Sequence, residues 1–503
     1  MLSIRVLQLG DKDFSSQYKI CEGAEWNYEP DLNMDDPEYD AAIVDRPLSD
    51  EEAEILSRIV RAHSLFLLDG LVLSKVMEKM MKSRCGQMMA REDLQKFLKD
   101  GLRNYYGRPY GEKFDPHMLA IASGFQGHVT WHGFTEVVLE GNFGAEMKQA
   151  AYWRGNIPVE KGQAIDFWLE YEKDDSVEIE LEIVLFLGGS VSSVQKVWTF
   201  SEAQLQDQVT IDNQMQDGPV FASLRAKGEG TLKLSALHDR YSRRGAGAFF
   251  PGGRRTVTSS REEIFTYMDP GDLKPPLCVY FSGYKTMEGF EGYRMMRRMG
   301  CPFVLVSESR LEGGAFYLGS EEYESKLSAV LQGYMNELGF NRNQVVFSGL
   351  SMGTFGALYY GSMIRPAYII VGKPLMSLGN MAEAERLERP GGFPTSLDVL
   401  WKQYRSLDHE AAEKLNQRFW KKFDQTDWSG RTFIAAYMLE DDYDKTAYQE
   451  MISHIGSGAR VVGKGLHGRH NDDTSGIVHW FVRQYNRVLQ DGYDRRPDDG
   501  KSR

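Results

Sequence analysis

The sequence predicts a mixed α/β protein of three folded units, and two patterns in the chain carry this prediction. In residues 1–112 and 260–490, short apolar runs alternate with helical stretches, which favours parallel sheets covered by helices. In residues 113–250, apolar and polar side chains alternate one by one, which indicates strands with one buried face. A chain of 503 residues has room for about three domains.

The composition excludes several classes of function. A net charge of -13 and a pI near 5.4 argue against binding to nucleic acid or to an anionic membrane. The four cysteines lack C-x-x-C spacing, which favours reduced thiols in a cytoplasmic protein over a disulfide or zinc framework (Cys21, Cys85, Cys278, Cys301). No apolar stretch approaches the ~18 residues of a membrane span, so no transmembrane segment is expected.

The first unit, residues 1–112, is predicted to be a small parallel α/β unit. Its strands are expected at Ile4–Gly10, Tyr39–Asp45 and Ser64–Gly70, with a helix that begins after Ser49. Gly10 does not belong to a G-x-G-x-x-G pattern, so no nucleotide site is predicted.

The second unit, residues 113–250, is predicted to be a β-sandwich that is similar to carbohydrate-binding modules. In Val177–Leu185 apolar residues alternate with glutamates, as on a strand with one buried face. Four tryptophans of this unit could form a face that stacks on sugar or could fill the core, and the sequence favours neither (Trp131, Trp153, Trp168, Trp198). Residues 240–255 follow as a connector rich in glycine and arginine, a composition typical of a solvated linker, with contact to an anion as the alternative.

The third unit, residues 260–490, contains the pattern around which the chain is organised. The apolar run that ends at Phe347 leads into the G-x-S-x-G sequence Gly349–Gly353, and a helical stretch with small residues follows. A strand, a sharp turn and a helix with this pattern form the nucleophile elbow of the α/β-hydrolase fold, a mostly parallel sheet with helices on both faces. The elbow would expose Ser351 as a nucleophile, with the Met352 N–H able to stabilise an oxyanion.

The partners of a serine nucleophile follow it in the chain in this fold. Glu440, Asp441 and Asp442 come directly after the strand Thr432–Leu439, and we favour Glu440 as the acid because it comes first, with Asp441 as the alternative. The loop after the last strand carries His467 and His470, and we favour His470 as the base because it lies closer to the following helix.

Other features of this unit complete the prediction. The second oxyanion donor is expected from the loop after the strand Leu277–Gly283, with Gly283 favoured and Tyr284 as the alternative. An insertion at about 374–429 occupies the position of a lid, and the charged tail 491–503 is expected to be flexible. No metal-binding motif and no cofactor are predicted.

The segments Ser348–Tyr360 and Gly468–Thr474 resemble the second of the numbered accessory Sec system proteins of Gram-positive bacteria. This resemblance extends over the whole chain. It implies a protein that serves the export of serine-rich-repeat glycoprotein adhesins. The implied location is the cytoplasm, with a peripheral position at the membrane translocon as a further possibility. The implied partners are the two sibling accessory Sec proteins, the accessory Sec motor ATPase and the glycosylated adhesin.

The resemblance also implies O-acetylation of N-acetylglucosamine on the adhesin from an acetyl donor, with Ser351, His470 and one residue of the Glu440–Asp442 run as the catalytic residues. Two other hypotheses remain open at this stage. One is a non-catalytic scaffold with a hydrolase fold, and the other is a carboxylesterase for small molecules.

Overall fold

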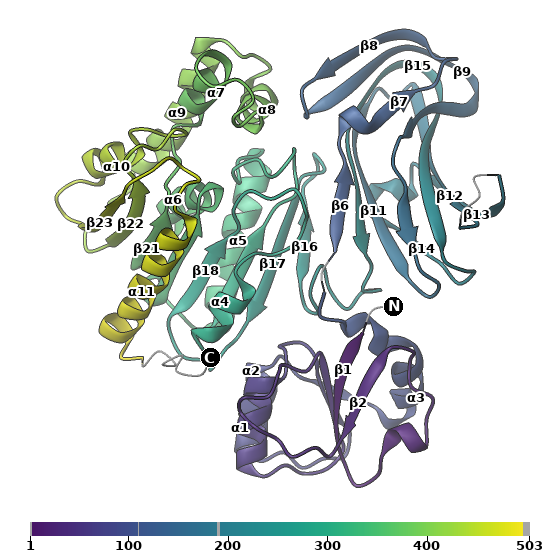
Figure 1. The fold of residues 1–503 in the computed structure, drawn as a ribbon, viewed down its shortest axis with the longest axis vertical. Coiled ribbons are helices and arrows are strands. Elements are labelled where there is room, and N and C mark those ends of the chain that lie inside the picture. The colour runs from purple at the N-terminus through teal and green to yellow at the C-terminus, as the bar shows by residue number, and fades with distance from the viewer. Residues whose placement is uncertain (1–2, 109, 189–191, 496–503) are drawn as a thin grey trace.

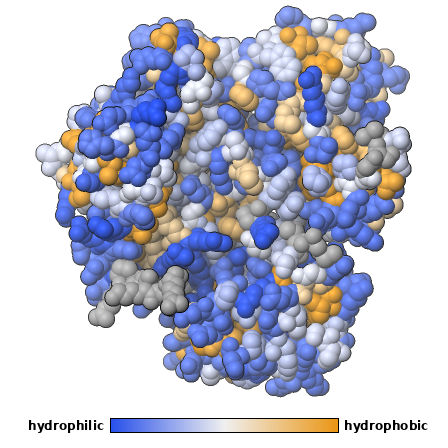
Figure 2. Space-filling model, viewed as in Figure 1, coloured by the Kyte–Doolittle hydropathy of each residue, from blue (hydrophilic) through white to orange (hydrophobic). Residues whose placement is uncertain are grey.

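The computed structural model describes residues 3–108, 110–188 and 192–495. The chain forms three units, each built around its own β-sheet (Figure 1). The N-terminal unit lies at the bottom of the view, the β-rich unit at the upper right and the C-terminal α/β unit at the left. The face shown in Figure 2 is mostly hydrophilic, with apolar residues in small scattered groups. No helix within the described ranges has the length and hydropathy that a bilayer crossing requires.

The N-terminal unit contains a five-stranded, fully parallel sheet of order β2-β1-β3-β4-β5, as the α/β prediction requires. Successive residues of β1 point to opposite faces: Leu7 packs under α1 and α2, and Val6 packs under the helical run that follows β5. The elements are β1 (Ile4–Leu9), β2 (Ala24–Tyr28), β3 (Ala41–Val44), α1 (Asp50–Ile59), β4 (Leu65–Leu68), α2 (Lys75–Ser83), β5 (Gln87–Met89) and a run of short helical turns that includes α3 (Leu94–Lys96).

The ten antiparallel strands of the β-rich unit form one hydrogen-bonded network around one apolar core. The long strand β15 pairs with β12 near its start and with β11 near its end, and Gly228 and Gly230 adopt positive φ values where its register with β9 shifts. These glycine bends let one strand serve both halves of the unit. The strands are β6 (Gly111–Phe114), β7 (Leu119–Ile121), β8 (Gln126–His132), β9 (Glu136–Trp153), β10 (Ile157–Val159), β11 (Ala164–Lys173), β12 (Val177–Phe186), β13 (Val194–Ser201), β14 (Val209–Asp212) and β15 (Gly218–Tyr241).

The tryptophans of this unit do not form a common face. Trp153 and Trp168 are buried, whereas Trp131 on β8 is 41% exposed. A sugar-stacking face made of all four tryptophans is therefore excluded by burial.

The C-terminal unit contains an eight-stranded sheet of order β16-β17-β19-β18-β20-β21-β22-β23. The strands from β19 to β23 are parallel, and only the β16–β17 and β17–β19 pairs are antiparallel. The elements are β16 (Arg254–Val257), β17 (Glu263–Asp269), β18 (Leu277–Phe281), α4 (Tyr293–Arg298), β19 (Phe303–Ser307), α5 (Glu321–Leu338), β20 (Val345–Leu350), α6 (Met352–Ile364), β21 (Tyr368–Gly372), β22 (Thr432–Met438), α10 (Ala447–Ile455), β23 (Arg460–Leu466) and α11 (Thr474–Tyr493).

Both faces of the central strands of this sheet are buried, as their continuous apolar runs predict. Along β18, Val279 and Phe281 belong to the core beneath α5 and α6, whereas Cys278 and Tyr280 belong to the core beneath α4 and α11. The carboxyl ends of the central strands are therefore held rigidly between two layers of helices.

The insertion between β21 and β22 forms three helices, α7 (Leu378–Leu387), α8 (Thr395–Tyr404) and α9 (His409–Asp424). Helix α9 packs against the helix after the elbow, with the rings of Phe419 and Phe355 5.1 Å apart. The insertion also reaches the β-rich unit, where the Phe134 N–H donates to the Asp398 carboxylate at 2.9 Å.

The connector 240–255 is not a solvated linker, which corrects the prediction. Arg243 is 1% exposed and donates to the carbonyl oxygens of Phe249, Asn104 and Tyr106. A buried guanidinium with carbonyl partners ties the connector to the N-terminal unit at this point.

The chain end also differs from the prediction. Helix α11 continues to Tyr493, and the Arg495 guanidinium donates to Asp272 at 2.8 Å and to the Pro275 carbonyl at 3.0 Å. Residues 491–495 are thus anchored to the sheet unit, and the rest of the predicted tail, 496–503, lies outside the described residues.

Candidate active site

Ser351 lies between the end of β20 and the start of α6 in the strained conformation that the elbow pattern predicts. Its φ is +51° and its ψ is -122°. A Cβ atom on Gly349 would lie 2.3 Å from the Gly353 carbonyl oxygen, and one on Gly353 would lie 2.1 Å from that of Phe281. Only glycine fits at these two positions, because the turn brings three backbone segments together.

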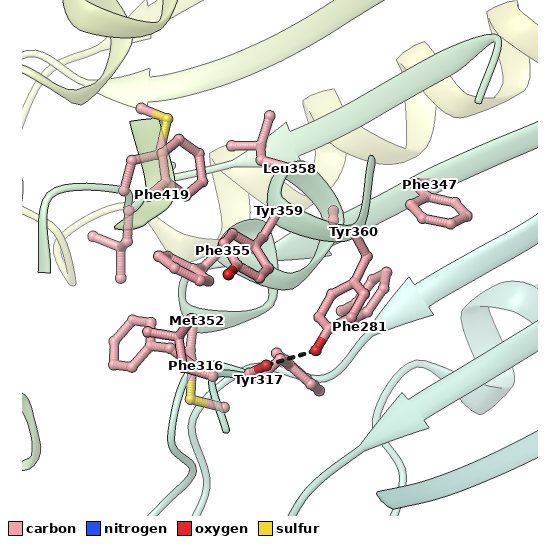
Figure 3. Close-up of a cluster of buried hydrophobic side chains, with 14 of the residues drawn as sticks. Phe281, Phe316, Tyr317, Phe347, Met352, Phe355, Leu358, Tyr359, Tyr360 and Phe419 are labelled. Atoms are coloured by element: carbon pink, nitrogen blue, oxygen red, sulfur yellow. Dashed lines mark hydrogen bonds between the residues drawn. The ribbon is translucent and has the colours of Figure 1, made fainter. Parts of the chain in front are cut away.

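The helix that follows Ser351 is buried along nearly its whole length, which fixes the serine in place. Its aromatic residues pack with those of the surrounding loops and of α9 (Figure 3). The Tyr360 hydroxyl donates to the Tyr317 carbonyl oxygen at 2.8 Å within this cluster. The elbow thus rests on a rigid apolar core.

His470 completes a hydrogen-bonded chain that starts at Ser351. Its Nε2 lies 2.9 Å from the Ser351 Oγ, and its Nδ1 lies 2.9 Å from the Asp441 Oδ2. His470 is 1% exposed and Asp441 is 7% exposed. A serine, a histidine and a carboxylate in this order allow the imidazole to accept the serine proton while the carboxylate fixes its tautomer.

The acid in contact with His470 is Asp441, not the favoured Glu440. Glu440 lies at the surface, where it accepts from the Gly468 N–H at 2.6 Å and pairs with His467 at 3.2 Å. The Gly468 N–H, followed by the His467 side chain, lowers the pKa of Glu440. The prediction of Glu440 from its place directly after the strand was wrong, because the turn after β22 exposes Glu440 and buries Asp441. His467, the other candidate base, is 88% exposed and stays away from the serine.

Tyr443 and Arg389, which were not predicted from the sequence, help to fix the position of His470. The Tyr443 ring stacks on the imidazole with centroids 4.3 Å apart and planes 4° from parallel. The Arg389 guanidinium lies 4.2 Å from the centre of the Tyr443 ring and pairs with Asp442, which accepts the His470 N–H at 3.0 Å. Tyr443 could have been predicted as a neighbour of the catalytic residues, because it directly follows the Glu440–Asp442 run. Nothing in the sequence around Arg389 indicates its place in the site.

The expected oxyanion donors are arranged differently from the prediction. Within the described chain the Met352 N–H has no hydrogen-bond partner, so it can donate to a ligand. The Gly283 N–H is not available, because it donates to the Glu291 carboxylate at 2.6 Å. The alternative, the Tyr284 N–H, has no partner among the residues that the structure describes. Of the two predicted donors of this loop, the alternative Tyr284 therefore has a free amide and the favoured Gly283 does not.

Two lysines lie near these groups, Lys373, which is buried, and Lys285, which is half-buried. Burial lowers the pKa of Lys285 to about 8, against the opposing effect of Glu291 and Glu288. Burial also lowers the pKa of Lys373, whose Nζ lies 3.3 Å from the Thr474 hydroxyl, against the effect of Asp441 and Glu291. Across residues 3–108, 110–188 and 192–495, no group of three or more His, Cys, Asp or Glu side chains is placed to hold a metal ion.

Comparisons with known proteins extend over nearly the whole chain. The model of the accessory Sec system GspB-transporter family matches residues 4–495. The second of the numbered accessory Sec system proteins of Streptococcus gordonii is 36% identical over 506 residues, which covers 98% of this chain and 99% of the relative. Its counterpart from Staphylococcus aureus is 36% identical over 509 residues, covering 98% and 97%.

Among solved structures, a chain of the Glycosylation Associate Protein (Gap123) complex from Streptococcus agalactiae superposes with a TM-score of 0.87 at 33% identity, covering 98% of this chain and 99% of that one. The match in sequence and the match in fold therefore agree from one end of the described chain to the other. The chain belongs to the accessory Sec system GspB-transporter family.

Proposed function

We propose that the protein is a serine-dependent O-acetyltransferase that also serves adhesin export within the accessory Sec system. The observation that carries the catalytic half is the chain of 2.9 Å contacts from Ser351 through His470 to Asp441. The strand order of the C-terminal sheet, 1-2-4-3-5-6-7-8 when its strands are numbered along the chain, supports an α/β-hydrolase fold.

In the first half of the reaction, the Ser351 oxygen attacks the acetyl carbon of an acetyl ester or thioester. The serine proton passes to His470 Nε2, and the negative charge that develops on the carbonyl oxygen is stabilised by the Met352 and Tyr284 N–H groups. When the tetrahedral intermediate collapses, the bond to the leaving group breaks and that group takes the proton from His470. Ser351 then carries the acetyl group.

In the second half, a sugar hydroxyl gives its proton to His470 while its oxygen attacks the acetyl carbon of the acyl-enzyme. Collapse of this intermediate breaks the bond to the Ser351 oxygen, which regains the proton from His470. Asp441 holds the imidazole in the tautomer that both halves need and stabilises its charged form. Water as the acceptor would give hydrolysis by the same steps.

The acceptor and the partners rest on family membership. The resemblance of the chain to the second numbered accessory Sec protein implies acetylation of N-acetylglucosamine on serine-rich-repeat adhesins. The matched Streptococcus agalactiae chain comes from a Glycosylation Associate Protein complex. We infer that this protein acts in the cytoplasm or peripherally at the translocon, with its two sibling accessory Sec proteins, the motor ATPase and the glycosylated adhesin as partners.

The test is the mass of the glycans on the exported adhesin in cells that carry the native protein or Ser351→Ala, with export measured in parallel. The expected result is loss of a mass increment equal to acetyl while export continues. His467→Asn is the matched control, because it removes a histidine of the same loop that does not contact Ser351. Unchanged glycans in Ser351→Ala would contradict acetyl transfer and leave the hydrolase-like unit as a scaffold for export.

A further inference from the structure

Glu288, in the loop of residues 282–292, is bound by two side chains of the β-rich unit. His238 Nδ1 contacts the Glu288 Oε1, and Arg240 Nε donates to the Oε2 at 2.5 Å. The Glu288 N–H also donates to the Gly111 carbonyl of β6 at 2.7 Å. The loop belongs to the sheet unit by sequence, and β15 and β6 hold its centre together with the Ser307 hydroxyl, which donates to the Gly289 carbonyl at 2.7 Å.

These contacts are buried, and each carboxylate in them pairs with an arginine or a histidine. The side chains of His238 and Glu288 are at most 1% exposed and that of Arg240 is 7% exposed. Burial favours the neutral form of Glu288, but Arg240 followed by His238 outweighs this effect and lowers the pKa of the carboxyl group. Arg240 also donates to both oxygens of Glu263, at 2.6 and 2.7 Å, and His238 Nε2 lies 3.2 Å from Glu170. The cluster is therefore an ordered anchor, since each buried charge in it has a partner.

The same loop reaches the elbow at its other end. Glu291, three residues after Glu288, accepts the Gly283 N–H at 2.6 Å, and its own N–H donates to the Ser282 hydroxyl at 3.1 Å. A Cβ atom on Gly283 would lie 3.2 Å from the Leu350 carbonyl oxygen, which immediately precedes Ser351. The residues between these two anchors include Tyr284, whose N–H is unpaired within the described chain.

We propose that His238 and Arg240 are positioning residues for the active site: through Glu288 they fix the 282–292 loop and hold the Tyr284 N–H at the oxyanion. The β-rich unit is then a structural component of the catalytic centre and not a separable binding module. The inference rests on the proposed function in one respect, the assignment of this amide to the oxyanion.

The experiment measures acylation of Ser351 by p-nitrophenyl acetate, followed by mass spectrometry, in the full-length protein and in Glu288→Gln. The substitution keeps the size of the side chain and removes the charge that Arg240 and His238 bind. The expected result is a rate at saturation that is lower by about 10- to 100-fold, with the half-saturating concentration unchanged, because a displaced oxyanion donor affects the transition state more than substrate binding. Amide hydrogen exchange in residues 282–292 should become faster, which a loss of catalytic chemistry alone would not cause.

Arg405→Gln is the matched control, because Arg405 pairs with Glu136 across the same two units without touching the loop. It should leave the rate unchanged. Arg240→Lys, which keeps the charge but loses the planar fork, serves as a second variant.

Amide hydrogen exchange of the wild-type protein in low urea tests the same inference without a variant. The hydrogen-bonded amides of residues 282–292 should become exposed to exchange together with those of β15. Equal acylation rates in wild type and Glu288→Gln, or opening of the loop independently of β15, would overturn the inference. If wild-type Ser351 is not acylated at all, the proposed function fails instead, and the exchange result still decides whether β15 holds the loop.

Discussion

The Tyr443 ring lies face to face with His470, with centroids 4.3 Å apart and planes 4° from parallel. Stacking restricts the imidazole to the plane in which Nε2 meets Ser351 and Nδ1 meets Asp441. The Arg389 guanidinium, which belongs to the insertion, lies 4.2 Å from the centre of the Tyr443 ring. The insertion thus helps to position His470, in addition to packing against α6 through α9.

Removal of the stacking ring should lower activity without removing any group that carries out the chemistry. In Tyr443→Ala the imidazole gains freedom to turn, and we expect acylation of Ser351 to slow by roughly 10- to 100-fold. Tyr443→Phe keeps the ring and should retain most of the rate. Stopped-flow measurement of the acylation burst with p-nitrophenyl acetate compares the two. Equal losses in both variants would show that the hydroxyl, which accepts from Asn471 at 3.2 Å, is the part that matters.

The identity of the acid can be tested by a pair of variants in adjacent residues. Asp441→Asn would leave His470 in the wrong tautomer, and the rate should fall by about 10³- to 10⁴-fold. Glu440→Gln should have little effect, because among the described residues the Glu440 carboxylate hydrogen-bonds only to His467 and to the Gly468 N–H. The measurement is the same acylation rate at neutral pH. A large loss in Glu440→Gln with a small one in Asp441→Asn would restore the prediction from sequence.

The contrast between Glu440 and Asp441 shows which features of the site can be predicted from the sequence and which cannot. The positions of the parallel strands and the strand-turn-helix at Ser351 follow from apolar runs and glycine spacing, which are local signals. Which carboxylate turns inward depends on how the loop after β22 crosses the loop after β23, and the Gly283 amide is occupied by a carboxylate eight residues later. These are tertiary relationships, and neither periodicity nor residue type records them.

The β-rich unit gives a second example of the same limit. Strict alternation in residues 177–185 identifies a strand with one buried face, and β12 has this pattern. The alternation carries no information on which strands share an edge. The length of β15 and its bends at Gly228 and Gly230 join ten strands into one hydrogen-bonded network, which the sequence did not predict.

The contact between the insertion and the β-rich unit should depend on pH through Asp398. Burial raises the pKa of this carboxyl group from 3.8 to about 6, although the Phe134 N–H and the Thr135 hydroxyl oppose the shift. Between about pH 4 and 6 the folded protein therefore keeps a proton that the unfolded chain has released. The stabilising contribution of the group is complete below about pH 4 and is lost as the pH rises through 6.

Asp398→Asn removes this titration while it preserves an oxygen that can accept from Phe134. The free energy of unfolding of the wild type, relative to this variant, should fall by about 2–3 kcal/mol between pH 4 and pH 7. Urea unfolding at several pH values, monitored by tryptophan fluorescence, gives the difference. A difference that stays constant over this range would mean that Asp398 does not change its ionisation there.

Alanine substitutions at Gly353 and Gly333 should change the free energy of unfolding in opposite directions. In Gly353→Ala the new methyl group would lie 2.1 Å from the Phe281 carbonyl oxygen, which is backbone and cannot rotate away. We expect a loss of at least ~3 kcal/mol in the free energy of unfolding, or displacement of Ser351 with loss of its acylation. In Gly333→Ala on α5 nothing lies within 4 Å of the new methyl group, and the better helix former should stabilise the protein by about 0.5–1 kcal/mol. Urea unfolding of both variants, with acylation of Ser351 measured on the folded protein, tests the pair. If Gly353→Ala were as stable and as reactive as wild type, the close crossing of the elbow with the end of β18 would be contradicted, and with it the geometry that exposes Ser351.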